Sequence, residues 1–218
     1  MKRHFTALLM VMLSLPTLAG DISKPGYIIN LNGDTLRGKV LLRETKKGYY
    51  DLIELFVSIK FQDSMGNAVV YHPGQIQGFG YTFGSDSSYV HFRSFPSVEM
   101  KGTFGIKKET VFLLRECSGI IEVYYLYHKN DALIQSSKIP EVYIISHHDS
   151  SAAKLTWIPN DKIKFGSNQL IYRKTTIAPY LKDWPEDNLN EVPKEMPIPT
   201  LFMVFSSYNL WWALQHKL

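Results

Sequence analysis

Apolar and polar residues alternate from about residue 27 to residue 145, and turn sequences interrupt the alternation at short intervals. This pattern is typical of antiparallel strands that bury one face. The first predicted hairpin covers residues 27–43, with Tyr27, Ile29 and Leu31 as apolar positions before the turn Asn32-Gly33-Asp34. In its second strand we expect Leu36, Val40 and Leu42 to face the core, Arg37, Lys39 and Arg43 to face water, and Gly38 to mark a bulge or bend.

Further strands are predicted at residues 55–61, 68–71, 78–83 and 89–95. Leu55, Val57, Ile59 and Phe61 form one apolar face, and the polar stretch 63–67 closes it as a second hairpin. Residues 72–77 are predicted to cross irregularly to the next strand. With a one-turn helix before the last strand, these strands would close a small SH3-like barrel. We expect a loop at 84–88 and an irregular connection at 96–105.

A third predicted hairpin joins residues 110–115 to residues 120–127 through the turn 116–119. The continuous apolar run at 111–114 indicates a strand that is covered on both faces. Ile121, Val123, Tyr125 and Tyr127 share one face of the partner strand. Residues 142–145 and 154–158 would extend the same sheet.

The last 40 residues hold five of the eleven prolines and end in a predicted helix that starts at Ile198-Pro199-Thr200. Its apolar positions recur at helical spacing: Leu201, Val204, Phe205, Tyr208, Trp211 and Trp212. The run from Leu201 to Leu214 is fourteen residues long, whereas a membrane span needs about 20 apolar residues. We expect the helix to dock on the β domain; the alternative is a helix that binds a partner or a membrane surface.

The pattern therefore predicts a mainly β fold with a small C-terminal α part: an SH3-like small barrel, further antiparallel strands, then C-terminal helices. We divide the chain into a signal peptide (1–19), a barrel-like part (20–95), a second antiparallel part (96–165) and a Pro-rich part with helices (166–218). Lys2 and Arg3 precede the apolar stretch 5–15, and small residues end at Ala19, which is typical of a secretory signal. We expect an exported protein, in the periplasm or associated with the cell envelope, that begins near Gly20.

Composition narrows the function classes further. Hydrophobic residues make up 45% and charged residues 20% of the chain, which excludes a disordered protein. The formal charge of +4 falls to +2 without Lys2 and Arg3, and the other basic residues are scattered, so a nucleic-acid partner is not expected. Cys117 is the single cysteine and cannot form an internal disulfide. It could be a nucleophile or an intermolecular bridge, but no base is identifiable near it, so we favour a small residue at a tight turn.

Residues 26–40, with the sequence GYIINLNGDTLRGKV, fit the pattern G-[YF]-[IV]-x3-N-G-D-T-[IL]-x-G-x-[IV]. This stretch resembles the start of a family of exported β-rich proteins of unknown activity from Bacteroidota. Further matching pieces follow in order: Ile59-Lys60-Phe61, Tyr71-His72-Pro73, Gln75 to Phe79, Phe112-Leu113-Leu114, Tyr180 to Pro185, and Tyr208-Asn209 closing a helix. Trp184 stands where relatives often carry cysteine. The resemblance implies export and supplies no catalytic residues.

Local clusters of chemically active residues are few. His147-His148-Asp149 is the one local group of metal-ligand types, but neighbouring histidines at a strand end point to opposite sides. Ser118 lacks the context of a nucleophile elbow, and Asn32-Gly33-Asp34-Thr35 lacks the acidic positions of a metal loop. The acids are scattered: Asp51, Glu54, Asp63 and Glu99. The sequence therefore nominates no catalytic, cofactor-binding or metal-binding residue, and no cofactor.

Two hypotheses of function remain. The favoured one is a non-enzymatic binding or scaffold module whose partner is another envelope protein or a glycan. It draws on a surplus of aromatic residues, which could also serve cross-strand pairing: Tyr49, Tyr50, Tyr71, Phe79, Tyr81, Phe83, Tyr89, Tyr124, Tyr125 and Tyr127. The alternative is a periplasmic hydrolase or other enzyme whose site would assemble His72, His91, His128, His147 or His148 with distant acids. The oligomeric state is left open.

Overall fold

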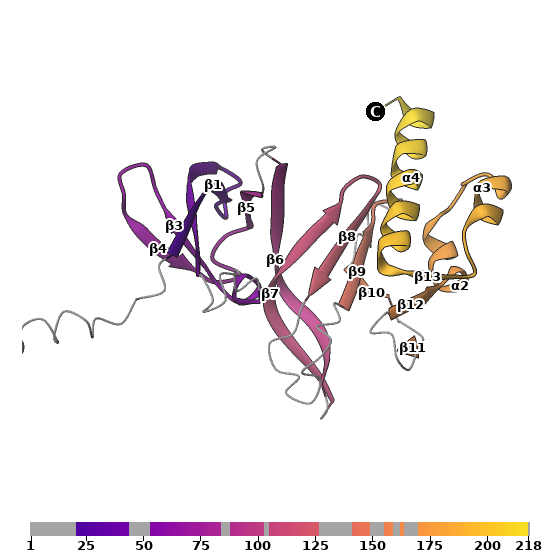
Figure 1. Cartoon of the computed structure of the whole chain (residues 1–218), viewed down its shortest axis with the longest axis horizontal. Helices are drawn as coiled ribbons and strands as arrows, with labels where there is room; N and C mark the ends of the chain where they lie inside the picture. The colour runs from indigo at the N-terminus through magenta and orange to yellow at the C-terminus, as the bar shows by residue number, and fades with distance from the viewer. Residues whose placement is uncertain are drawn as a thin grey trace, which may run out of the picture.

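The computed structural model describes residues 21–43, 53–83, 88–102, 105–126, 141–148, 155–158, 162–163 and 170–217, and the fold is mainly β as predicted. Within these ranges, ten antiparallel strands form one sheet in the order β10-β9-β8-β7-β6-β5-β1-β2-β3-β4 (Figure 1). The strands are β1 (Asp21–Ile29), β2 (Thr35–Arg43), β3 (Ile59–Gln62), β4 (Ala68–Tyr71), β5 (Gly78–Phe83), β6 (Ser88–Gly102), β7 (Gly105–Cys117), β8 (Ile121–Leu126), β9 (Glu141–Ser146) and β10 (Thr156–Trp157).

A smaller sheet and short helices make up the C-terminal part. The small sheet has the order β11-β12-β13, formed by Lys162–Ile163, Leu170–Arg173 and Glu195–Pro197. The helical segments of the described chain are η1 (Glu54–Phe56), α2 (Lys174–Ile177), η2 (Ala178–Tyr180), α3 (Glu186–Glu191) and α4 (Ile198–His216). No helix in the described ranges is both long and apolar enough to cross a membrane.

The first hairpin forms where the turn sequence predicted it. The side-chain oxygen Oδ1 of Asn30 accepts hydrogen bonds from the backbone N–H of Asn32 at 3.0 Å and of Asp34 at 2.9 Å. Gly33 adopts a φ of 91°, which side chains other than glycine rarely allow. The predicted turn therefore rests on local chemistry, and it sets the register of β1 against β2 from Asp21↔Arg43 to Ile29↔Thr35.

The predicted core face of this hairpin is only partly correct. Val40 and Leu42 are buried, but Leu36 is 48% exposed. β3 pairs with β2 only at Lys39 to Leu41, so Leu36 lies beyond the strand that covers this face. In β1 the buried residue is Ile28, one position away from the predicted apolar positions, and Leu31 lies in the exposed turn.

Two further local predictions need correction. Of the two alternatives for Gly38, the bulge is wrong, because the register is unbroken around the pair Gly26↔Gly38, and the bend stays a prediction. Instead its missing side chain leaves room for the Phe61 ring, which a Cβ at this position would approach to 2.6 Å. The stretch 55–57 is not a strand: Leu55 belongs to η1 and Val57 is exposed, so β3 begins only at Ile59.

The SH3-like barrel stays a prediction. The short helix lies before β3, not before β5, and β5 pairs onward with β6, which continues the sheet. The irregular connection predicted at residues 96–105 is also wrong, because β6 and β7 extend as a hairpin to Gly102 and Gly105. Pro96, which suggested a break, lies at a shift in register between Phe95 and Val98, where a missing N–H is tolerated.

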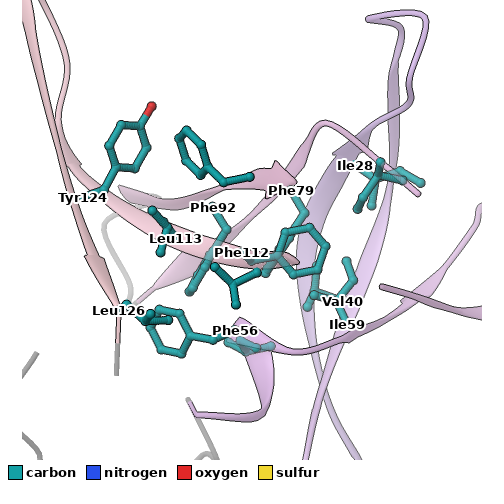
Figure 2. Close-up of a cluster of buried hydrophobic side chains, with 14 of the residues drawn as sticks. Ile28, Val40, Phe56, Ile59, Phe79, Phe92, Phe112, Leu113, Tyr124 and Leu126 are labelled. Atoms are coloured by element: carbon teal, nitrogen blue, oxygen red, sulfur yellow. The ribbon is translucent and has the colours of Figure 1, made fainter. Parts of the chain in front are cut away.

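Two clusters of buried side chains hold the fold together. The first lies between the N-terminal strands, η1 and the β6–β7 hairpin, where the rings of Phe79 and Phe92 stack at 4.5 Å and Phe112 meets Phe79 edge-on (Figure 2). It therefore draws on residues from both sides of residue 95. The division into parts 20–95 and 96–165 stays a prediction.

The second cluster lies between the sheet and α4. Ile121 and Val123 of β8 and Ile144 of β9 are fully buried together with Leu201 and Phe205 of α4. Val111, Phe112 and Leu113 of β7 are buried, so this strand is covered on both faces as predicted. The prediction that the C-terminal helix docks on the β part is confirmed.

Candidate functional site

A groove of about 470 Å³ lies between α3 and α4. Its apolar lining residues are Trp184, Val192, Pro193, Met203, Val204 and Trp211, and its polar ones are Asn188, Glu191, Thr200 and Ser207. The groove combines two indole rings with aliphatic walls, and polar groups stand beside them. This composition is typical of a binding surface.

The two tryptophans of the groove are positioned by Tyr208. Trp184 meets the Tyr208 ring edge-on at 5.5 Å, and Trp211 stacks on it at 5.7 Å. Asp183 adopts a positive φ of 62°, and this bend places Trp184 next to α4. The indole N–H of Trp184 is buried and has no hydrogen-bond partner in the described part of the chain. Both rings are therefore fixed by packing.

Charge around the groove is negative on the α3 side. Glu191 lines the groove itself, and Glu186 and Asp187 are exposed on the same helix. The six residues of α3 include no lysine or arginine. The groove is thus complementary to an apolar group that carries a positive charge beside it.

A stripe of exposed apolar side chains continues from the groove along α4. Met203, Leu210 and Leu214 are 68%, 64% and 69% exposed, and their spacing of seven and four residues keeps them on one helix face. Met203 also lines the groove. We refer to Met203, Leu210 and Leu214 as the outer stripe. It adjoins the groove at Met203, and the exposed Ser206 and Ser207 lie between Met203 and Leu210.

The opposite face of α4 is fastened to the sheet by Asn209. Its amide donates to the Ile121 carbonyl at 2.7 Å and accepts from the Ile121 N–H at 2.9 Å. Gly119 makes room for this contact, since a Cβ there would lie 2.6 Å from the Asn209 side chain. Asn209 lies within α4, which continues to His216, so the helix does not close at Tyr208-Asn209 as the resemblance implied.

His148 forms a second link between the sheet and the helical part. Its Nε2 lies 2.8 Å from the Tyr208 hydroxyl and 3.2 Å from the Tyr180 carbonyl, and Tyr208 itself donates to the Lys182 carbonyl at 2.6 Å. Since both neighbours of Nε2 act as acceptors, we assign the ring proton to Nε2. Burial lowers the pKa of His148, which favours the neutral ring.

His147 belongs to a different group of side chains. Its Nε2 lies 3.5 Å from the Glu122 carboxylate, which also binds Arg93 at 3.0 Å and accepts from the Tyr124 hydroxyl at 2.8 Å. The two neighbouring histidines thus have separate partners, as their positions at a strand end predicted. Asp149, the third member of the predicted cluster, lies outside the described residues.

The remaining histidines do not join these two. The Tyr27 hydroxyl hydrogen-bonds His91 on β6, whereas His72 lies in the connection after β4, with its Nδ1 3.4 Å from the Val57 carbonyl. His128 lies outside the described residues. Among those that are described, no three His, Cys, Asp or Glu side chains are grouped so that they could hold a metal ion. The enzyme built from dispersed histidines stays a hypothesis.

Cys117 ends β7 and packs against the second cluster of buried side chains. Burial raises the pKa of its thiol to about 11, so the thiol is protonated at neutral pH. The amide of Asn209 lies 3.9 Å from its sulfur. These surroundings favour a structural residue near a turn over a nucleophile. Ser118, in the same turn, is exposed, and its carbonyl lies 3.4 Å from the Asn209 amide.

The predicted acids also lie apart. Glu54 belongs to η1, and Asp63 caps the β3–β4 turn, where hydrogen bonds from Asn67 lower the pKa of its carboxyl group. Asp51 and the side chain of Glu99 lie outside the described residues.

The predicted aromatic surplus divides between core and surface. Phe79, Tyr81, Tyr124 and Tyr125 are buried, whereas Phe83 and Tyr89 are 52% and 40% exposed and Tyr71 is half-buried. Tyr49, Tyr50 and Tyr127 lie outside the described residues. Most of the described rings therefore serve packing.

No protein-family model, curated protein or solved structure matches the chain. The groove was not predicted from the sequence, because Trp184 and Trp211 come from segments that only the tertiary fold brings together. A sequence signal existed for part of it: Met203, Leu210 and Leu214 place apolar residues on a second face of α4, more than one docked face needs.

Proposed function

We propose that this chain is a non-enzymatic binding module of the cell envelope, and that its groove and outer stripe dock an apolar segment of another envelope protein. The proposal of export rests on the signal-like sequence of residues 1–19. The proposal of a protein partner rests on the apolar surface along α4.

The observation that carries the proposal is the outer stripe. Three large aliphatic side chains, each more than 60% exposed, lie on one face of a helix whose other face is buried. A large apolar patch that is left uncovered at the surface of a protein often marks a binding site. Met203 links the stripe to the groove, so one partner segment could contact both.

The groove composition favours a protein segment over a sugar. Met203, Val192, Val204 and Pro193 present aliphatic surface, which matches apolar side chains better than hydroxyl groups. Glu191 in the groove and the acids of α3 favour a lysine or arginine beside the apolar residues of the partner.

Site-specific photocrosslinking in intact cells of the natural host tests this proposal. A photoreactive residue at position 203 should yield a light-dependent adduct of defined mass, because Met203 lies at the junction of groove and stripe. The matched control carries the same group in place of Lys39, which is exposed on β2. Leu210→Asp, added to the variant with the photoreactive residue at position 203, should abolish the adduct.

Three results would contradict the proposal: no adduct from position 203, equal adducts from positions 203 and 39, or an adduct that Leu210→Asp leaves unchanged. Fractionation of the same cells tests export separately, because an exported protein is found outside the cytoplasmic fraction.

A further inference from the structure

A row of side chains crosses strands β1, β5, β6 and β7 of the large sheet, whose arrangement is drawn in Figure 1. Tyr27 of β1 pairs with Gly80 of β5, Gly80 with His91 of β6, and His91 with Arg115 of β7. Directly opposed residues of antiparallel strands project to the same face of a sheet. Arg37 of β2, opposite Tyr27, continues the row. Arg115 pairs onward with Tyr124 of β8. The Tyr27 and His91 rings therefore lie between two arginines of the row, Arg37 and Arg115.

Gly80 allows the rings to meet. A Cβ at Gly80 would lie 2.7 Å from the Tyr27 ring, so this ring lies over the bare backbone of β5. From there the Tyr27 hydroxyl reaches Nδ1 of His91. Tyr89 completes the group, with its ring centroid 5.8 Å from that of Tyr27 and 6.1 Å from that of His91. Tyr89 is 40% exposed, so one ring of the group is open to a ligand.

The hydrogen bond to Tyr27 is the basis on which we assign the His91 proton. Burial, together with the nearby Arg115 charge, lowers the pKa of His91, and burial raises the pKa of Tyr27, so both groups are neutral at pH 7. We assign the Tyr27 hydroxyl as the donor to Nδ1, which places the ring proton of His91 on Nε2. His91 then offers an N–H donor from the position directly opposite Arg115 in the sheet.

Arg115 is not neutralised by the protein. In the described ranges no carboxylate or other hydrogen-bond acceptor binds its guanidinium, although the side chain is half-buried. Arg93, two residues from His91 on β6, provides the contrast. Its guanidinium lies 3.0 Å from the Glu122 carboxylate and donates to the Tyr124 hydroxyl at 3.3 Å. A guanidinium that is partly removed from water and has no counter-charge favours an anionic ligand.

We propose that Arg115 and the Nε2–H of His91 bind an anionic group of an acidic saccharide, a sulfate, phosphate or carboxylate, and that its sugar ring packs on Tyr89. The fork of donors on Arg115 matches two oxygens of such a group. The exposed tyrosine ring offers an apolar face for the C–H side of the sugar. This site is independent of the groove and does not rest on the proposed protein partner.

Calorimetric titration of the full chain tests the proposal with three probes at low salt: a sulfated disaccharide, a uronic-acid disaccharide and the unsulfated parent. We expect saturable binding of at least one acidic probe that weakens as salt is added, and no binding of the neutral parent. Arg115→Gln should raise the dissociation constant by about tenfold or more, since it removes a charge-assisted contact. Lys60→Gln removes the same charge from β3 and should change it less than about twofold, because Lys60 pairs with Asp21 outside the row.

Tyr89→Ala tests the contact with the sugar ring. It should weaken binding of the acidic disaccharide, whereas binding of free inorganic sulfate in the same titration should not change. If Arg115→Gln fails to fold, Arg115→Lys keeps the charge but loses the fork, and it should still weaken binding severalfold. The proposal is overturned if neither acidic probe binds, if the neutral parent binds equally well, if folded Arg115 variants bind like the unaltered chain, or if Lys60→Gln weakens binding as much as Arg115→Gln.

Discussion

Asn209 is a polar residue that α4 presents to the sheet among apolar neighbours, and it is only 9% exposed. Its side-chain amide pairs with both backbone groups of Ile121. These backbone groups follow the β7–β8 turn. Asn209 therefore supplies two partners that would otherwise have to come from water or from another strand.

Asn209→Ala should destabilise the chain by about 2 kcal/mol or more, because it removes the hydrogen bonds of this amide to the N–H and C=O of Ile121 in a buried place. Gln215→Ala, on the exposed end of the same helix, should change stability by less than about 0.5 kcal/mol. Urea denaturation of the two variants measures both values. Equal stability of the Asn209→Ala variant and the unaltered chain would contradict the role given to this amide.

His148 makes the link between sheet and helices sensitive to acid. Its pKa is lowered in the folded chain, mainly by burial, so the folded chain takes up the proton less readily than the unfolded one. The neutral His148 ring therefore contributes its full stabilisation above a pH of about 6.5, the ordinary pKa of histidine. This contribution is lost as the pH falls through the lowered pKa of the folded chain. His91, whose pKa is also lowered, adds to the same loss.

Urea midpoints measured from pH 7.5 to pH 5 should therefore decrease with acidity. His148→Gln should make this decrease smaller, because glutamine can still hydrogen-bond but does not titrate. A variant with the same decrease as the unaltered chain would show that His148 is not one of the groups responsible.

At the scale of single elements, the hairpin β1–β2 tests the register. Val40→Asp should unfold the chain because it places a carboxylate in the first cluster of buried side chains. Lys39→Asp and Leu36→Asp should each cost less than about 1 kcal/mol, since both positions are exposed. Thermal denaturation compares the three variants. If Leu36→Asp lowered the melting temperature as much as Val40→Asp, the buried face of β2 would extend to Leu36, contrary to the structure.

Turns were the elements that the sequence predicted best, because their chemistry is local. Asn30 and Asp63 each bind backbone N–H groups two and four residues on, so the turn residues alone indicate both hairpins. The stretch 55–57 was mispredicted because an apolar alternation can also be accommodated by a 3-10 turn. The register shift near Pro96 depends on the partner strand β7, which the local sequence does not show.

For the whole molecule, the two proposed binding surfaces lie on different elements. The groove and outer stripe belong to the helical part, whereas the row that includes Arg115 lies on β1, β5, β6 and β7 of the large sheet. The sequence could predict that α4 docks, because its apolar positions recur at helical spacing. It could not show that Trp184 meets Trp211 through Tyr208, or that Tyr27 meets His91 across Gly80, since both depend on pairings between distant segments.

The central claim is that α4 holds the fold with one face and keeps the other free for a partner. The most direct test is the free energy of unfolding of two full-length variants, Phe205→Asp and Leu210→Asp. Phe205 is fully buried and Leu210 is 64% exposed. Phe205→Asp should unfold the chain, whereas the free energy of unfolding of Leu210→Asp should stay within about 0.5 kcal/mol of that of the unaltered protein. A Leu210→Asp variant destabilised by several kcal/mol would contradict the central claim, because the outer stripe would then be covered within the chain and closed to a partner.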